Sequence, residues 1–343
     1  MSDDAGSRRK GCAIAVYRNS VFALALAFAW LATVSAQASA AYSIFDVKGA
    51  SWGTYPQSVN DGGTVAGTFV VDGVNHGFIR TPDGIITKFD VKGSSSTTVF
   101  AINKKGTVTG YYDDASGNSH GYVRSPGGKT TSFDVEGSFA TQGQSINDLG
   151  EVTGIYVDSS FKFRGFVRSA DGTIETFDPQ GSVDTQANGI NDSGVVTGSF
   201  FDGAATHGFI RAADGTLTTF DGESSSDTEP HAIDSGDSIA GFFSDGSGLF
   251  HGFVRAADGT ITSFDAPNAT DTQAISINSK GAITGYYSMP NSHAFLRTAN
   301  GKMKSFAPPK AVSSSGASIN NNGFIAGFVE DSRNKVHGFI RTP

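Results

Sequence analysis

A segment of about 44 residues is repeated along this chain, and this repetition limits the fold more than any other feature of the sequence. Each copy ends in His-Gly-Phe or a close variant, followed by one apolar residue and an arginine. The successive arginines lie 44, 44, 43, 44, 42 and 44 residues apart, at Arg80, Arg124, Arg168, Arg211, Arg255, Arg297 and Arg341. A unit this short cannot bury a hydrophobic face by itself, so neighbouring units must pack together. The sequence therefore predicts a repeat protein.

Each unit contains four short runs of β-branched and aromatic residues with turn signals between them. In the copy that ends at Arg211, these runs are Thr173–Phe177, Thr185–Ile190, Val195–Phe201 and His207–Arg211. An Asn-x-x-Gly turn joins the second run to the third, and an x-Asp-Gly turn precedes the first run in most units. Both turns have the chemistry of β-hairpin connections. The unit is therefore predicted to be a four-stranded antiparallel sheet.

The two ends of the repeat array complement each other. The segment Tyr42–Asp46 matches the first run of a unit, whereas the chain ends after His337–Arg341, where another such run would follow. The N-terminal strand can therefore complete the last sheet. We predict an all-β fold, a seven-bladed β-propeller of four-stranded blades whose ring is closed by the N-terminal strand in the last blade. An open β-solenoid is the alternative. In both cases residues 41–343 form a single repeat domain.

The N-terminal 40 residues have the pattern of a secretory signal peptide. Basic residues precede the apolar run Val21–Ala36, and Ala38, Ser39 and Ala40 form an A-x-A-like cleavage site. A membrane anchor is the alternative, but the run is shorter than the ~20 residues that a spanning helix needs. We therefore predict cleavage after Ala40 and a secreted or periplasmic protein.

Cysteine usage and charge limit the partners. The single cysteine, Cys12, lies in the predicted signal peptide, so the mature chain would have no thiol for a disulfide or a thiolate metal site. Residues 1–40 contain four basic and two acidic side chains, which leaves 21 basic and 31 acidic ones in residues 41–343. Nucleic acids and anionic membranes need a basic surface. We expect a monomer with no cofactor, no metal, no nucleic acid and no membrane partner.

The repeat motifs also resemble a known family. The segment His293, Ala294 and Phe295, its His-Gly-Phe or His-Gly-Tyr counterparts, and the IN-x-x-G-x-[VI]-x-G segments are similar to those of the bacterial extracellular HAF-repeat family. The resemblance covers essentially all of residues 41–343. It implies export and a β-propeller-like fold, and it implies no reaction.

Polar residues that recur in nearly every unit are interpreted as structural. Equivalent positions of a ring lie far apart, so residues that occur once per unit cannot converge on one ion unless they face the axis. We expect the repeated histidines to hold loops by hydrogen bonds, the phenylalanine of each Phe-Asp pair to fill the core, and the aspartate to cap the following turn. The histidines are His76, His120, His207, His251, His293 and His337, with Arg164 in the remaining unit.

The recurring Asn-x-x-Gly turn is expected to be broken in the fifth unit, where Asp237 replaces glycine.

Function is expected where the copies differ. The connections after Phe-Asp and before His-Gly-Phe vary in length, and alternate connections of a four-stranded meander lie on the same side. We call that side the variable-loop face and the opposite side the tight-turn face. The second run of each unit is expected to form the inner strand, nearest the axis of the ring. Its third and fifth positions before the turn Asn or Asp are mostly polar, and strand alternation would place them on one side. These positions lie toward the variable-loop end of the central channel, which we call the channel mouth. The candidate ligand-binding residues there are Tyr55, Gln57, Gln142, Gln144, Gln186, Asn188, Glu229, His231 and Gln273.

Three functions remain open. The favoured one is a secreted binding module for a glycan or a peptide, since amides and aromatic rings suit hydroxyl-rich ligands. The second is an extracellular carbohydrate-active hydrolase or lyase that uses Glu229 and His231, but glycoside hydrolysis normally needs two carboxylates facing the bond. No catalytic residue can be assigned, and enzyme activity is the less favoured reading. The third is a structural surface-interaction protein without a small-molecule site.

Overall fold

The computed structural model describes residues 41–223, 225 and 227–343, and these residues form strands without any helix. The predicted signal peptide, residues 1–40, lies outside the described residues. No helix in the described part of the chain is long and apolar enough to cross a membrane.

The strands fall into consecutive groups of four. The innermost strands are β2 (Gly53–Val59), β6 (Ser96–Ile102), β10 (Ala140–Ile146), β14 (Asp184–Ile190), β18 (Asp227–Ile233), β22 (Asp271–Ile277) and β26 (Ser313–Ile319). The second strands are β3 (Val65–Val71), β7 (Val108–Asp113), β11 (Val152–Val157), β15 (Val196–Phe201), β19 (Ile239–Ser244), β23 (Ile283–Met289) and β27 (Ile325–Glu330).

The third strands carry the His-Gly-Phe motif. They are β4 (Val74–Arg80), β8 (Ser119–Arg124), β12 (Phe163–Arg168), β16 (Thr206–Arg211), β20 (Phe250–Arg255), β24 (Asn291–Arg297) and β28 (Val336–Arg341). The outer strands are β1 (Tyr42–Phe45), β5 (Ile86–Phe89), β9 (Thr130–Phe133), β13 (Ile174–Phe177), β17 (Leu217–Phe220), β21 (Ile261–Phe264) and β25 (Met303–Phe306). The predicted all-β architecture of repeated four-stranded sheets is confirmed.

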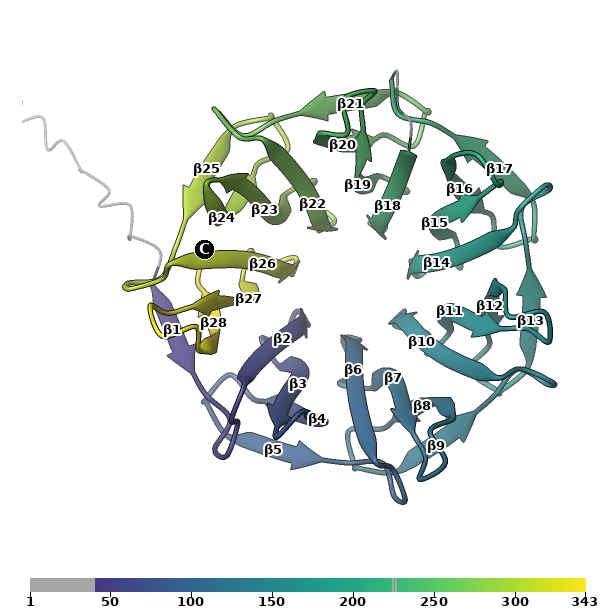
Figure 1. Ribbon diagram of the computed structural model, residues 1–343, viewed down its shortest axis with the longest axis horizontal. Helices are drawn as coiled ribbons and strands as arrows, with labels where there is room; N and C mark the ends of the chain where they lie inside the picture. The colour runs from purple at the N-terminus through teal and green to yellow at the C-terminus, as the bar shows by residue number, and fades with distance from the viewer. Residues whose placement is uncertain (1–40, 224, 226) are drawn as a thin grey trace, which may run out of the picture. The chain divides into compact units, whose positions relative to one another are not determined.

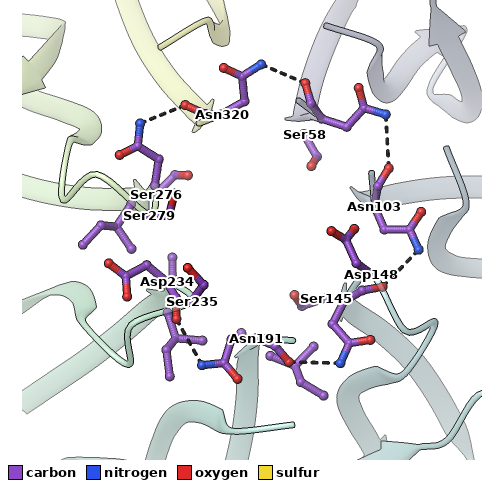
Figure 2. A pocket seen from close by; sticks show the side chains of 18 of the residues that line it. Ser58, Asn103, Ser145, Asp148, Asn191, Asp234, Ser235, Ser276, Ser279 and Asn320 are labelled. Carbon is purple, nitrogen blue, oxygen red and sulfur yellow. Dashed lines mark hydrogen bonds between the residues drawn. The ribbon is translucent and has the colours of Figure 1, made fainter. Parts of the chain in front are cut away.

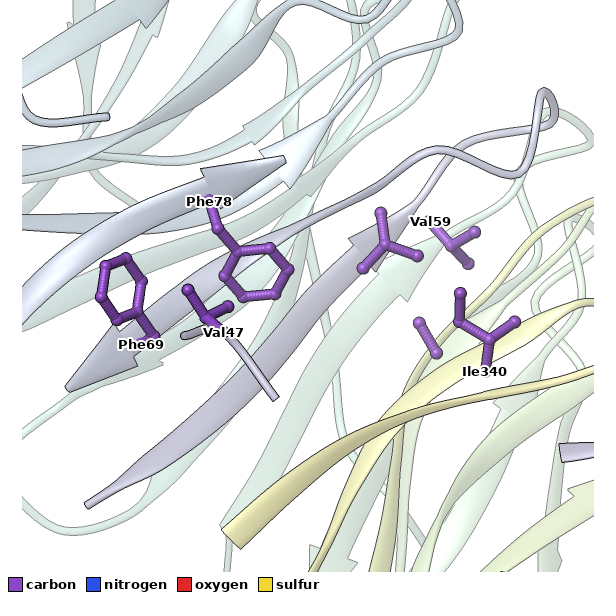
Figure 3. Close-up of a cluster of buried hydrophobic side chains, with 7 residues drawn as sticks. Val47, Val59, Phe69, Phe78 and Ile340 are labelled. Carbon is purple, nitrogen blue, oxygen red and sulfur yellow. The ribbon is translucent and has the colours of Figure 1, made fainter. Parts of the chain in front are cut away.

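The sheets are antiparallel meanders arranged around a central opening (Figure 1). In the first one, β2 pairs with β3, β3 with β4, and β4 with β5. The strand β1 does not pair with any of β2–β5; it pairs antiparallel with β28, with Tyr42 opposite Arg341, and β28 is joined to β2 by one parallel bridge. The early and late units also share one hydrophobic core, in which Val59 and Phe78 pack with Ile340 (Figure 3).

The repeated His-Gly-Phe-x-Arg and Phe-Asp motifs form one set of contacts between strands. Gly77 lies opposite Phe89 on β5, and a Cβ at position 77 would be 2.5 Å from that ring, so a larger residue would have to displace the ring. Phe78 packs edge-to-face on Phe45, with ring centroids 5.9 Å apart. The Arg80 guanidinium lies 4.9 Å from the centroid of the same Phe45 ring, a cation–π contact between neighbouring sheets. The closing arginines of the other units make the same contact.

The repeated histidines are structural, as predicted. His207 Nδ1 lies 2.8 Å from Asp221, the aspartate of the Phe-Asp pair, and its Nε2 lies 3.3 Å from Asp202 in the hairpin loop. This contact corrects the expected role of that aspartate, which pairs with the histidine instead of capping the following turn. Arg164 makes equivalent ion pairs with Asp158 and Asp178 of its own sheet.

The fifth turn keeps its shape, contrary to the prediction that it is broken. Asp237 takes the left-handed conformation of the missing glycine, with φ 63°, and its N–H donates to the carbonyl of Asp234 at 3.2 Å. Aspartate tolerates this conformation better than most residues. The substitution therefore changes the charge of the turn and leaves its backbone in place.

Candidate functional site

A cavity of about 280 Å³ opens at the tight-turn end of the central channel. Its wall is made of inner-strand residues such as Ser58, Ser145 and Ser276, and of the first residues of the Asn-x-x-Gly turns. Figure 2 shows these side chains around the opening.

The turn asparagines of the cavity form what we call the asparagine belt. Each buried side chain donates from Nδ2 to the backbone carbonyl of the corresponding residue in the next unit (Figure 2). The bonds run from Asn60 to Asn103 (3.1 Å), Asn103 to Asn147 (3.0 Å), Asn147 to Asn191 (3.0 Å), Asn191 to Asp234 (3.0 Å), Asn278 to Asn320 (2.8 Å) and Asn320 to Asn60 (2.8 Å). Within the described residues, the bond from position 234 to Asn278 is missing, because a carboxylate has no N–H to donate.

The residues that follow the asparagines form a second set of bonds between units. The backbone N–H of Lys104 donates to Asp148 at 2.7 Å, and that of Asp148 donates to Asp192 at 2.7 Å. Asn321 likewise donates from its backbone and its amide to Asp61. Most polar groups at this end of the channel therefore join neighbouring units, which makes them a poor site for a ligand.

The inner strands contain a bulge at the predicted site positions. The register shifts between Pro56 and Ser58, so that Gln57 is an extra residue, and the other inner strands shift at the same place. A bulge interrupts the alternation of side chains. The third position before the turn is the bulged residue itself, so its pointing to the same side as the fifth position stays a prediction.

Two of the predicted site residues, Asn188 and His231, line the cavity. The Asn188 amide donates to the carbonyl of Pro230 at 2.8 Å, so it too joins neighbouring units. The His231 ring stacks on Phe242, with centroids 5.1 Å apart, and burial lowers the pKa of His231 to about 4. The imidazole of His231 is therefore neutral at physiological pH.

Glu229 and Gln273 lie further toward the variable-loop end. Glu229 is half-buried; burial raises the pKa of its carboxyl, and the negative charge of Asp227 raises it further. Gln273 accepts a 2.5 Å hydrogen bond from the Tyr286 hydroxyl. No hydrogen bond or ion pair joins Glu229 to His231 in the described part of the chain, so the two do not form an acid–base pair. The described residues also contain no cluster of His, Cys, Asp or Glu fit to hold a metal.

The remaining predicted residues differ in their contacts. The Tyr55 ring packs against Phe328 of β27, with centroids 5.6 Å apart, and burial raises the pKa of Tyr55. Gln57, Gln142 and Gln144 are partly buried and Gln186 is exposed. Their amides have no hydrogen-bond partner among the described residues, which leaves these side chains available to a ligand.

The two variable loops of a sheet lie together at the same end of its strands, as predicted. The indole of Trp52, in the loop before β2, lies next to Gly73 in the β3–β4 hairpin. The Phe139 ring, in the loop before β10, stacks on Phe161 in the β11–β12 loop.

Large apolar side chains are exposed mainly on this face, a feature that the sequence reasoning missed apart from Trp52. Of the twelve such residues in the described chain, three lie elsewhere: Ile44, Ile85 and Leu149. The nine on the variable-loop face are Trp52, Val74, Phe139, Phe161, Phe163, Phe201, Leu249, Met289 and Val312. Sequence position could have indicated them, because all nine lie in or beside loops of variable length.

The comparisons with known proteins agree with the fold. No protein-family model matches the sequence, and no curated protein matches it either. A virginiamycin B lyase from Staphylococcus aureus, solved in a catalytically inactive form with quinupristin, is similar in structure with a TM-score of 0.62 and 15% identity, covering 88% of this chain and 99% of that one. Puromycin hydrolase gives 0.60 and 11% (84% and 52% covered), and a lectin from Burkholderia pseudomallei gives 0.55 and 11% (84% and 96%). At these identities the likeness shows a β-propeller-like fold alone.

Proposed function

We propose that the domain is a seven-bladed β-propeller whose ring is closed by β1 in the last blade. Three contacts between the first and last units support it: β1 pairs with β28, Asn320 donates to Asn60 in the asparagine belt, and Ile340 packs with Val59. An open β-solenoid, the alternative, would leave its first and last units without such contacts.

We propose that the protein is a secreted binding module for a glycan or a peptide, with its ligand at the channel mouth on the variable-loop face. The observation that carries this proposal is that most of the exposed large apolar side chains of the described residues lie on that face, three of them close together, with Phe139 stacked on Phe161 and near Phe163. Exposed apolar groups that adjoin one another commonly mark interaction sites, whereas single ones are ordinary. The amides of Gln57, Gln142, Gln144 and Gln186, which have no partner within the described residues, add hydrogen-bonding capacity on the inner strands.

The cavity on the tight-turn face is a weaker candidate. Its amides and carboxylates already bond neighbouring units, and a ligand that took these bonds would weaken the contacts between sheets. A glycan or peptide gains little from groups that must first break a hydrogen bond of the protein.

Enzyme activity is a second candidate because of Glu229. A half-buried carboxyl with a raised pKa is suited to proton transfer. The nearest acidic group in sequence, Asp227, is already engaged, since its carboxylate accepts hydrogen bonds from the Thr206 N–H and the Ser244 hydroxyl. Because Asp227 on the same strand is engaged, Glu229 has no free carboxylate beside it on β18, and binding is the better supported function.

Glycan and peptide arrays test the binding function. We expect the wild-type protein to select ligands of one class. Gln186→Ala should lower the affinity for the selected ligand about three- to tenfold, the effect of losing one hydrogen bond. Gln186 is exposed and makes no bond within the described structure, so its removal should leave the fold intact.

Lys104→Ala is the matched control, because Lys104 lies at the opposite mouth of the channel. Loss of binding in Lys104→Ala with full binding in Gln186→Ala would place the ligand on the wrong face for this proposal. An array with no bound ligand at all would leave the structural surface protein as the better description.

A further inference from the structure

Four of the β-hairpin loops that precede the third strands share one pattern. Each starts with an aspartate, and the position three residues later has a left-handed backbone. At that position the loops have Gly117 (φ 85°), Phe161 (φ 60°), Gly248 (φ 82°) and Asn334 (φ 62°). In each loop the aspartate Oδ1 accepts hydrogen bonds from backbone N–H groups two and four residues later.

Phe161 is the exception in this set. A left-handed backbone suits glycine and is tolerated by asparagine, but it is unfavourable for a bulky aromatic residue. The side chain of Phe161 is also 74% exposed, so it gains little from burial in the fold. The other loops show that the hairpin forms without a ring at this position. A strained and exposed residue that the fold does not require points to a functional role.

Phe161 belongs to a small aromatic patch. Its ring is stacked on that of Phe139, which is 52% exposed, with centroids 4.6 Å apart and planes only 6° from parallel. Phe163, 40% exposed, begins β12 opposite Val157, and the carbonyl of Val157 accepts a hydrogen bond from the Phe139 N–H. We call Phe139, Phe161 and Phe163 the phenylalanine patch.

The chemistry of the patch favours one kind of ligand. Its rings present only carbon and hydrogen, whereas a glycan needs hydrogen-bond partners close to each stacked sugar. The exposed carboxylate of Glu136 lies in the same loop as Phe139, and residues 41–343 contain ten more acidic than basic side chains, 31 against 21. That charge disfavours a second copy of this chain and an anionic lipid surface.

We propose that the phenylalanine patch anchors apolar side chains of a peptide segment that carries net positive charge. The inference rests on the proposed binding function and narrows its ligand to a peptide. Buried aromatic anchors contribute most of the affinity in interfaces of this kind, and the acidic surface would attract the basic residues of the segment.

The variant Phe161→Gly tests the role of the ring, because glycine is the residue that two of the related loops already have. The probe is an array of peptides that contain Lys or Arg, with and without Phe, Trp or Leu, read with the protein produced from its full sequence. We expect the wild-type protein to retain basic peptides with apolar side chains. Phe161→Gly should bind them roughly tenfold or more weakly while its melting temperature stays equal or rises, since the backbone strain is relieved.

Leu149→Ala is the matched control, since Leu149 is 59% exposed on the tight-turn face. It should bind as the wild type does. Equal binding of peptides by Phe161→Gly and the wild type would overturn the inference and leave the proposed binding function standing, as would an array on which only glycans are retained. A wild-type protein that retains neither peptides nor glycans would overturn both.

Discussion

A single residue, Asp234, distinguishes the fifth unit within the asparagine belt. In the other turns the Asn side chain performs two tasks: Oδ1 accepts a backbone N–H within the turn, and Nδ2 donates to the next unit. Asp234 keeps the first task, accepting the N–H groups of Gly236 and Ser238. It cannot perform the second, so the join between the fifth and sixth units lacks one buried hydrogen bond.

Asp234→Asn should therefore stabilise the protein. The new amide would donate to the carbonyl of Asn278, and a hydrogen bond of this kind contributes about 1 kcal/mol. Equilibrium unfolding in urea measures the change in free energy. The reverse change, Asn103→Asp, should cost about 1–3 kcal/mol, because it removes a bond and places a carboxylate beside a carbonyl. If Asp234→Asn is neutral or destabilising, the belt is not a source of stability.

At the scale of elements, a histidine with two aspartate partners joins three parts of one sheet. His207 on β16 contacts Asp221 after β17 and Asp202 in the hairpin loop, and its ring lies on Phe200 of β15. The hydrogen bond to Asp221 raises the pKa of His207, and partial burial lowers it by less. The pKa of Asp202 is lowered by backbone hydrogen bonds and by His207.

The pair predicts a pH dependence with a definite sign. A histidine with a raised pKa in the folded state contributes stability below its unfolded pKa of about 6.5, and this is lost as the pH rises through the folded value. The aspartate contributes stability above its unfolded pKa of about 3.9, and this stability is lost as the pH falls through the lowered pKa of the folded state. The pair should therefore contribute most between about pH 4 and 6.5.

The measurement compares His207→Gln with the wild type. Its loss of stability should be larger at pH 5.5 than at pH 8, by roughly 0.5 kcal/mol for a partly exposed pair. His293→Gln is the control, because Ala307 stands where the other units have aspartate and His293 bonds instead to the Met289 carbonyl. Destabilisation of His207→Gln that is the same at both pH values would show that the pair is held by neutral hydrogen bonds.

The elements themselves could be predicted, but their details only in part. The alternating runs and turn residues placed the strands of the unit ending at Arg211 within about one residue of β13–β16. The bulge at Gln57 could not be predicted, because an extra residue leaves no signal in a strand read by simple alternation. The Asn residues were explained locally by their turns, so their bonds to the next unit were missed. Phe161 was detectable from the sequence, since two of the related loops have glycine at the equivalent position.

At the scale of the whole molecule, the two faces differ in how their side chains are used. On the tight-turn face, the repeated residues bond one unit to the next. On the variable-loop face, side chains that differ between units are exposed and many have no partner in the described structure. The sequence predicted from loop lengths which connections share a face, because a meander must place alternate connections on the same side, but it did not predict the bonds between units.

The central claim is that the variable-loop face binds the ligand, and one matched pair of variants tests it most directly. Trp52 is 63% exposed on that face, and Ile85 is 62% exposed on the tight-turn face. The measurement is the affinity of Trp52→Ala and Ile85→Ala for the best ligand from the arrays. We expect Trp52→Ala to bind about tenfold more weakly and Ile85→Ala to bind as the wild type does. Equal affinity of the two variants, or a loss confined to Ile85→Ala, would contradict the claim.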